Sequence, residues 1–491
     1  MMILSRNFLD FGPIGWASSL ILLAVLALPG CGSGGGGGSP QQSIAATSSS
    51  EEGDLLVGIT DAEGDFLDYS VDVQSLKLIR ANGDVVETLP LTTRIDFTEL
   101  TEITEFLTLA TVPAGTYESV SMTLDFSTAE VVVQDDSGAA VEAVLQDASG
   151  AEPGITEVRL QLSGSDVIRI RPGVPAAFSL DFDLDASNEI DLSVVPAVVT
   201  VEPWLLATPE LEADRAHRGR GLLAAVDTQA STITLKIRPF RHRTGEFGRL
   251  QFTVEDDTSY EIDGVSWSGS DGLRAMAELS ENTPVIAGLT VSEGALIAHT
   301  VLAGSSVPWA DQDVIHGVVT ARAGDTLTVS GARIDFGDGQ SAFSRELTVQ
   351  IGVDTAVTQL TVDGPLGIEH ISVGSRITAF GEFLDDRTLD ASNGRVRLRF
   401  NQITGSVEQA SPLAMRLFYL NGRRPTAFDF SGTGMTSDSD ADPDFYEIDT
   451  TALGLNDIDA ADLLRVRGYV SEFGSAAPDY DAQTVIQIDT D

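Results

Sequence analysis

Gly221–Val226 (GLLAAV) decides the fold, because the same glycine-led start of a strand returns twice further along the chain. Its counterparts are Gly317–Ala321 (GVVTA) and Gly405–Gln409 (GSVEQ). The three starts are spaced at a period of about 90 residues, and such a period indicates a repeated structural unit.

A second glycine motif recurs in phase with the first. It occurs as Val285–Leu289 (VIAGL), Ile377–Phe383 (ITAFGEF) and Leu464–Val470 (LRVRGYV). Each unit has the pattern of three strands, a short loop or helix, and two more strands. Glycine in the first and fourth strands predicts tight curvature or a β-bulge. Five strands in a unit of this length predict a small closed Greek-key barrel of the OB kind.

We therefore expect β-barrel repeats over residues 219–312, 313–402 and 403–491, preceded by a linker over 206–218. Their strand pattern and glycine placement resemble a lipoprotein family catalogued as domain of unknown function 5666. OB-like barrels often bind oligonucleotides or sugars, but a fold alone does not carry a function.

Residues 53–205 have the pattern of a β-sandwich, which makes the whole chain all-β. Strand-forming stretches such as Ser70–Leu78 alternate apolar and polar residues, and turn signals such as Ala81–Asp84 separate them. Only Thr98–Ala110 has apolar residues near helical spacing, so we expect a helix there.

The order of short motifs in this region is similar to the lipoprotein family catalogued as domain of unknown function 4382. The motifs are Val57–Ala62, Val71–Leu76, Phe106–Leu107, Val112–Tyr117, Phe178–Asp183 and Val194–Pro196. The family usually has Pro after Thr-Asp-Ala, where this chain has Glu63. The resemblance implies a β-sandwich fold and a location at the cell surface, but it implies no activity. We interpret Pro113–Tyr117 as a structural turn before a core strand.

The first 30 residues have the features of a secretory signal peptide. A head with Arg6 is followed by the mostly apolar Ile14–Leu28, whose uninterrupted apolar run is shorter than the roughly 20 residues of a spanning helix. The segment ends in Leu28–Cys31 (LPGC), which resembles the lipobox of bacterial lipoproteins. The resemblance implies cleavage before Cys31, diacylation of its thiol and acylation of the new amine.

Residues 31–52 are rich in Gly and Ser and fit a flexible tether. Gly32 follows the cysteine, and by resemblance to enteric sorting this favours the outer membrane over retention in the inner one. We expect a lipid-anchored protein of the bacterial cell envelope, on the periplasmic or surface face of the outer membrane.

The charge of the chain argues against several classes of partner. Its 74 acidic residues outnumber 29 Lys and Arg, which gives a formal net charge of −45. Nucleic-acid binding rests on neutralisation of phosphates by Lys and Arg, and the large net negative charge also argues against direct docking on anionic headgroups, so neither partner is expected. Because Cys31 is the one cysteine in the sequence, the domains must be held by their cores without disulfides.

One basic patch stands out in this acidic chain. An arginine cluster can grip a carboxylate, phosphate or sulfate, but it can equally pair with the abundant acids of the same protein, and we favour internal pairing. The candidate anion-binding residues are Arg218, Arg220, Arg238, Arg241 and Arg243.

A run of alternating carboxylates near the C-terminus resembles the start of a calcium loop. Pro443 stands where an EF-hand needs Gly, and Asp449 replaces the closing Glu. We weigh an irregular calcium-stabilised loop against a solvated loop and favour the latter. The candidate ligands are Asp438, Asp440, Asp442, Asp444 and Asp449.

The sequence carries no zinc, nucleophile-elbow or phosphate-loop motif, and structural roles are expected for His316 and His370. We therefore expect no enzyme but an envelope protein that presents β binding modules to an envelope protein or a glycan. The alternatives are a hydrolase with a loop-borne site and a purely structural spacer.

Overall fold

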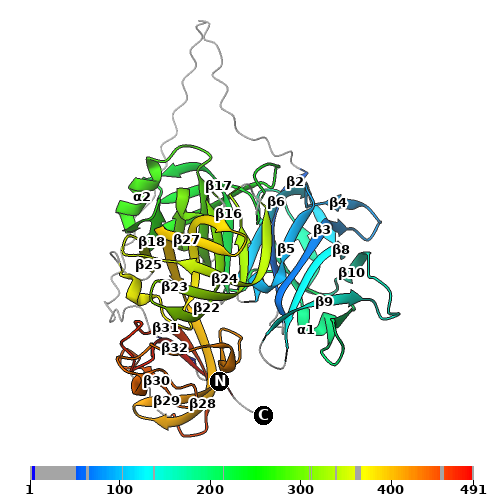
Figure 1. Cartoon of the computed structure of the whole chain (residues 1–491). Coiled ribbons are helices and arrows are strands. Elements are labelled where there is room, and N and C mark those ends of the chain that lie inside the picture. Colours follow the sequence, from blue (N-terminus) through cyan, green and yellow to red (C-terminus); the bar gives the residue numbers. More distant parts are fainter. Residues whose placement is uncertain are drawn as a thin grey trace, which may run out of the picture.

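The computed structural model describes residues 3–5, 51–61, 66–101, 103–135, 139–213, 215–240, 242–292, 294–308, 310, 312–337, 340–359, 366–453 and 458–488. Four bodies follow one another along the chain (Figure 1). An N-terminal sandwich, blue to cyan, lies beside two barrels in green and yellow, and a third barrel in orange to red lies beneath the second. This confirms the predicted all-β fold with a sandwich and three five-stranded barrels.

The first sheet of the sandwich is built around β2, which runs parallel to one neighbour and antiparallel to the other. Its strands in spatial order are β15 (Leu205–Thr208), β12 (Ala176–Phe182), β2 (Glu52–Thr60) and β6 (Ile103–Pro113). In β2 and β12 the residues that face the second sheet are fully buried, as Leu55, Val57 and Phe178 show.

The second sheet covers the other side of this core and is built on two long strands, β3 and β8. Its strands in spatial order are β13 (Asn188–Asp191), β14 (Ala197–Val201), β9 (Ala140–Gln146), β8 (Ser119–Gln134), β3 (Phe66–Ile79) and β4 (Val85–Glu87), with β10 (Ile155–Gln161) on β8 and β5 (Thr93–Asp96) on β3. The remaining elements are the pair β7 (Gly115–Tyr117) and β11 (Ile168–Ile170), the turns η1 (Phe97–Leu100) and α1 (Leu184–Ser187), and β1 (Ile3–Ser5), which pairs with β32.

The helix expected over Thr98–Ala110 is wrong. A single turn, η1, ends at Leu100, and β6 begins at Ile103. Five successive residues of β6, Thr104 to Thr108, are buried, because β6 lies inside a sheet that is covered on both faces. A strand covered on both faces loses the alternation of apolar and polar residues, so its apolar spacing resembled that of a helix.

The sandwich continues into the first barrel through one sheet. β16 (Ala216–Asp227) begins parallel to β6, with Ala216 opposite Ile103 and Arg218 opposite Glu105, and then turns into the barrel. The stretch 206–218, expected as a linker, thus contributes residues to β15 and β16.

Each barrel has the same connectivity, and its strands close in the order first, second, third, fifth, fourth and back to the first, with the third and fifth parallel. This is the OB arrangement. Barrel 1 has β16, β17 (Thr232–Ile237), β18 (Arg249–Ile262), β20 (Pro284–Ser292) and β21 (Ala295–Ala303), with β19 (Val265–Ser268), α2 (Gly269–Ala277) and η2 (Gly304–Ser306).

Barrels 2 and 3 repeat this order. Barrel 2 has β22 (Asp313–Ala323), β23 (Thr326–Asp335), β24 (Ser341–Gln350), β26 (Arg376–Asp385) and β27 (Thr388–Arg399), with β25 (Ala356–Gln359) and η3 (Ile368–His370). Barrel 3 has β28 (Asn401–Ala410), β29 (Leu413–Leu420), β30 (Tyr446–Asp449), β31 (Leu463–Val470) and β32 (Tyr480–Ile488), with η4 (Pro425–Ala427) and η5 (Ser437–Ser439).

The recurring glycines lie in the first and fourth strands, and most coincide with breaks in register, as predicted. The register of β26 against β27 shifts around Gly381, and that of β31 against β32 shifts next to Gly468. A Cβ at Gly381 would lie 2.2 Å from the Asp390 carbonyl oxygen, and one at Gly468 would lie 2.0 Å from that of Asp481. Glycine recurs here because the neighbouring strand approaches too closely for any side chain.

The sandwich and barrel 1 share one continuous core, whereas barrels 2 and 3 each have their own. The last two interlock, because Tyr469 of barrel 3 packs into the core of barrel 2 and Val373 of barrel 2 packs into that of barrel 3. Among the described residues no helix has the length and apolar character needed to cross a membrane.

Candidate functional site

Two of the arginines proposed to bind an anion form ion pairs between the sandwich and barrel 1. On β16, the Arg220 guanidinium lies 2.8 Å from a carboxylate oxygen of Glu99 and 3.0 Å from one of Glu105, which is fully buried. Arg218 contacts the same two carboxylates. For these two arginines the interpretation of internal pairing holds.

The other arginines of the patch have different surroundings. Arg238 is buried and donates to the carbonyl of Ile237 at 2.6 Å. Arg243 is exposed and donates to the carbonyls of Ala310 and Gly337. Arg241 lies outside the described residues, as does Cys31, the predicted lipidation site.

The acidic run of barrel 3 is held by hydrogen bonds within its own loop. Asp440 accepts the backbone N–H of Gly434, Asp442 that of Asp444, and Asp449 that of Thr451, each at 2.9 Å. In the described part of the chain no three His, Cys, Asp or Glu side chains gather as metal ligands would. The structure therefore does not gather the candidate calcium ligands Asp438, Asp440, Asp442, Asp444 and Asp449 into such a group.

A cleft between barrels 2 and 3 is large enough to hold a small-molecule ligand. Its volume is about 430 Å³, within the range of small-molecule sites. It is lined by Gln359, Leu366, His370, Ser375, Leu398, Asn401, Tyr469, Val470, Ser471, Glu472, Ser475 and Asp481.

One wall of the cleft is the loop 471–479, which connects the fourth and fifth strands of barrel 3. The loop is docked on η3 of barrel 2. The Phe473 N–H donates to the Glu369 carbonyl at 2.7 Å, and the Arg322 guanidinium lies 4.4 Å from the centre of the Phe473 ring. In OB barrels this connection is one of the loops that contact ligands.

His370 and Glu472 face each other across the cleft wall. Their Nε2 and Oε1 atoms are 3.2 Å apart, and His370 Nδ1 lies 3.2 Å from the Gly367 carbonyl oxygen. The nearby Ser475 hydroxyl donates to the Glu472 carbonyl at 2.7 Å. Among the described residues no serine hydroxyl is hydrogen-bonded to His370, so this histidine is not arranged to activate one as a nucleophile.

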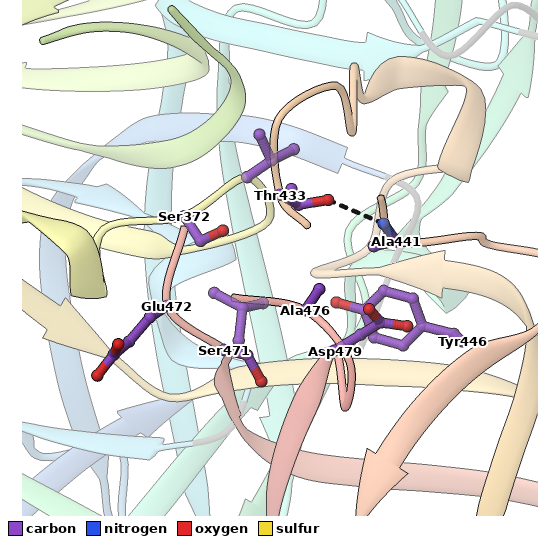
Figure 2. A pocket seen from close by; sticks show the side chains of 10 residues that line it. Ser372, Thr433, Ala441, Tyr446, Ser471, Glu472, Ala476 and Asp479 are labelled. Carbon is purple, nitrogen blue, oxygen red and sulfur yellow. Dashed lines mark hydrogen bonds between the residues drawn. The ribbon is translucent and has the colours of Figure 1, made fainter. Parts of the chain in front are cut away.

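A second, much smaller cavity shares the wall formed by Val470, Ser471 and Glu472 (Figure 2). Its volume of about 10 Å³ is close to that of one water molecule. Asp479 borders it and accepts the backbone N–H of Glu447 at 2.9 Å. Burial, with smaller contributions from the charges of Glu447 and Asp442, raises the pKa of Asp479 to about 7.

Sequence patterns did not reveal this cleft. His370 and Glu472 are far apart along the chain, and no spacing rule relates residues that meet only because two barrels dock. One part of the cleft could be located from the repeats. Aligning their glycine motifs identifies 471–479 as the loop between the fourth and fifth strands of barrel 3.

The chain was compared with known proteins and families. No curated protein matches it. The family match that was found lies in the sandwich, from β2 to β13. Residues 52–191 match the family model described as Domain of unknown function (DUF4382), which makes the N-terminal domain similar to that family.

Proposed function

We propose that the protein is a lipid-anchored envelope protein that binds a polar ligand through its C-terminal barrels without transforming it. In this proposal acylated Cys31 anchors the chain in the outer membrane, on its periplasmic or surface face. The barrels are then lipoprotein modules similar to domain of unknown function 5666.

The cleft between barrels 2 and 3 is the main observation that supports this function. Its lining combines amides and hydroxyls with two carboxylates, Glu472 and Asp481, and with the apolar side chains of Leu366, Leu398 and Val470. Such a surface hydrogen-bonds an uncharged polyhydroxylated ligand and repels anions, which favours a glycan over an acidic partner. The Tyr469 ring adds an aromatic wall, 4.9 Å from the ring centre of half-exposed Phe400.

A second surface of barrel 3 supports the same ligand class. Phe418 on β29 and Phe445 before β30 expose 40% and 41% of their surface. Strands two and three form the ligand-binding face of OB barrels, and exposed aromatic rings there can stack on sugar rings.

The proposal is tested with the soluble Cys31→Ser chain and a panel of neutral oligosaccharides, measured by calorimetry and on a glycan array. Ser475→Trp places a large ring at the cleft and should weaken binding at least tenfold. Ser437→Trp, on an exposed turn of the same barrel, is the matched control and should bind like the parent chain. If no oligosaccharide binds, or if both tryptophan variants bind equally well, the cleft is not a glycan site and the spacer becomes the better interpretation.

A further inference from the structure

The fifth strand of each barrel is paired on both of its sides. The fourth strand lies on one side, and a covering strand lies along the other. In barrel 1, β18 is that covering strand and pairs with β21 over Ile297–Ala303. In barrel 2, β24 pairs with β27 over Thr388–Asp390, and β25 continues the cover over Arg395–Leu398. Both repeats thus supply the cover of their fifth strand from their own residues.

In barrel 3 part of this cover comes from outside the repeat. β30 pairs with β32 only at Tyr480 and Asp481. Further along β32 the neighbour on this side is β1, which lies antiparallel to it over Thr484–Ile486. Among the described residues no strand of barrel 3 itself covers this part of β32. We call Thr484–Ile488 the β32 edge.

The strand that covers the β32 edge belongs to the predicted signal peptide. β1 consists of Ile3–Ser5, and the proposed cleavage before Cys31 would remove it. The mature chain would then keep β32 paired with β31 but leave the β32 edge uncovered. This step rests on the proposed function. A bare edge presents backbone N–H and C=O groups that can pair with another chain.

The β32 edge is held in a fixed position by the core of barrel 3. Val485 packs in that core together with Leu464 and Val466 of β31. Because side chains alternate along a strand, Thr484 and Ile486 point outward, and both are partly buried. An added strand would therefore meet backbone groups in a defined register, with an aliphatic side chain at Ile486.

The β32 edge lacks the residues that normally protect an exposed edge. Natural edge strands carry charged side chains or proline, which discourage pairing with other chains. β10, which pairs only with β8 in the sandwich, has Glu157 and Arg159. Thr484–Ile488 (TVIQI) has no charge, no proline and no glycine, and its Thr, Val and Ile favour strands. Its composition therefore suits an edge that is meant to be paired.

We propose that the β32 edge binds an extended peptide segment of another protein, which adds to barrel 3 as an antiparallel strand. Main-chain hydrogen bonds supply the affinity of such pairing, and alternate side chains supply the selectivity. β1 gives the register, with the aliphatic Ile3 opposite Ile486. The preferred ligand is thus an uncharged strand with an aliphatic residue at that position. The β32 edge lies beyond Asp481, which lines the cleft, so the two sites are distinct.

The test uses two soluble forms of the Cys31→Ser chain, one of full length and one that starts at residue 31. The probe is a fluorescent peptide with the sequence of Met1–Asp10, followed by anisotropy. We expect saturable binding to the shorter form and at least tenfold weaker binding to the full-length form, whose edge β1 already fills. Neither form can be acylated, so the result is independent of the membrane-release test for the anchor.

Two modified peptides test whether the main chain makes the contact. In an antiparallel pair the N–H groups of alternate residues point at the neighbouring strand. N-methylation at Leu4 therefore blocks one side of the peptide, and N-methylation at Ile3 and Ser5 blocks the other. One of these two peptides should lose binding to the shorter form, and the other should keep it.

A matched pair of variants tests the position of the site. Ile486→Lys puts a charge opposite the aliphatic residue of the peptide and should weaken binding at least tenfold. Ile155→Lys, at an exposed residue of β10, should bind like the parent chain. If Ile486→Lys does not fold, the methylated peptides still decide the question.

Three results would overturn the proposal: no binding to the shorter form, equal binding to both chain lengths, or equal binding of both methylated peptides. A shorter form that dimerises and takes up no peptide would also overturn it, because the β32 edge would then pair with a second copy.

Discussion

At the scale of single residues, Tyr117 shows how one hydroxyl fixes a turn. Its hydroxyl donates to the Pro113 carbonyl at 2.7 Å, and Arg80 donates to the same carbonyl at 3.0 Å while lying 5.0 Å from the centre of the Tyr117 ring. The structural role that the sequence predicted for Pro113–Tyr117 thus has a physical basis, since the ring fills the core while its polar end satisfies a backbone carbonyl.

The first residue-scale prediction concerns Cys31. Cys31→Ser should release the protein from membranes, because acyl chains contribute about 0.8 kcal/mol per buried methylene and nothing else in the chain is expected to anchor it. Membrane pelleting and intact mass compare the variant with the parent chain. A variant that still pellets, together with a parent chain without acyl mass, would refute the anchor.

The second residue-scale prediction concerns Asp68, whose carboxyl group is buried beside Asp96. Burial and the charge of Asp96 raise the pKa of Asp68 from an ordinary 3.8 to about 8. Between these two values the folded chain keeps a proton that the unfolded chain releases, so the free energy of unfolding falls as pH rises, by up to about 1.4 kcal/mol per pH unit. The contribution of Asp68 to the free energy of unfolding is fully present below about pH 4 and is lost as pH rises through about 8.

Asp68→Asn keeps the shape of the carboxyl and cannot ionise. It should therefore be more stable than the parent chain at pH 8 and lose less stability between pH 5 and 8. Urea unfolding across that range measures the difference, with the exposed Asp386→Asn as control. Identical pH profiles for the parent and Asp68→Asn would show that Asp68 is ionised in the fold.

At the scale of elements, the barrels were predictable and β6 was not. Bulge glycines recur because the close approach of neighbouring strands leaves no room for a Cβ. Each barrel therefore has the same glycine motifs in its sequence. The burial of β6 on both faces produces no comparable sequence motif, and the spacing of its apolar residues indicated a helix. The cleft arises where barrels 2 and 3 dock, and local sequence patterns contain no information about docking.

Gly381 and Gly352 provide a matched pair of glycines in barrel 2. Gly381→Ala would place a Cβ 2.2 Å from a backbone oxygen, whereas at Gly352 the nearest atom lies at an ordinary 3.4 Å. We expect Gly381→Ala to lower the free energy of unfolding by about 1–3 kcal/mol or more, and Gly352→Ala to have little effect. Chemical unfolding of both variants decides the point, and equal stabilities would mean that the bulge is not under steric constraint.

At the scale of the whole molecule, the boundary between sandwich and barrel 1 is visible in connectivity but not in packing. The shared core contains residues of both bodies, and the Thr108 hydroxyl donates to the Phe247 carbonyl at 3.0 Å. Barrel 3 has a core of its own. The family match ends within the sandwich. The domain that the family model defines is therefore smaller than the body formed by the sandwich and barrel 1, which share one core.

Fragments should reflect this packing. Residues 51–308 should unfold in one cooperative transition, whereas 206–308 alone should not fold, because this fragment lacks the sandwich half of the shared hydrophobic core and exposes the apolar residues of barrel 1 that pack against it. Residues 401–488 serve as the comparison and should fold on their own core. Circular dichroism melts measure all three, and a cooperative transition in 206–308 would show that barrel 1 is independent.

The position of β2 has a mechanical consequence for a protein proposed to be tethered at Cys31. β2 begins at Glu52, where the tether would join, and lies between β6, which pairs with it from Glu52 to Ile59, and β12, which pairs with it from Leu55 to Thr60. Because the hydrogen bonds of a sheet run across its strands, a pull along β2 strains both ladders at once instead of opening them one bond at a time. A force applied between the membrane anchor and a ligand bound by the C-terminal barrels would therefore have to shear the hydrogen bonds of β2 to both neighbouring strands together.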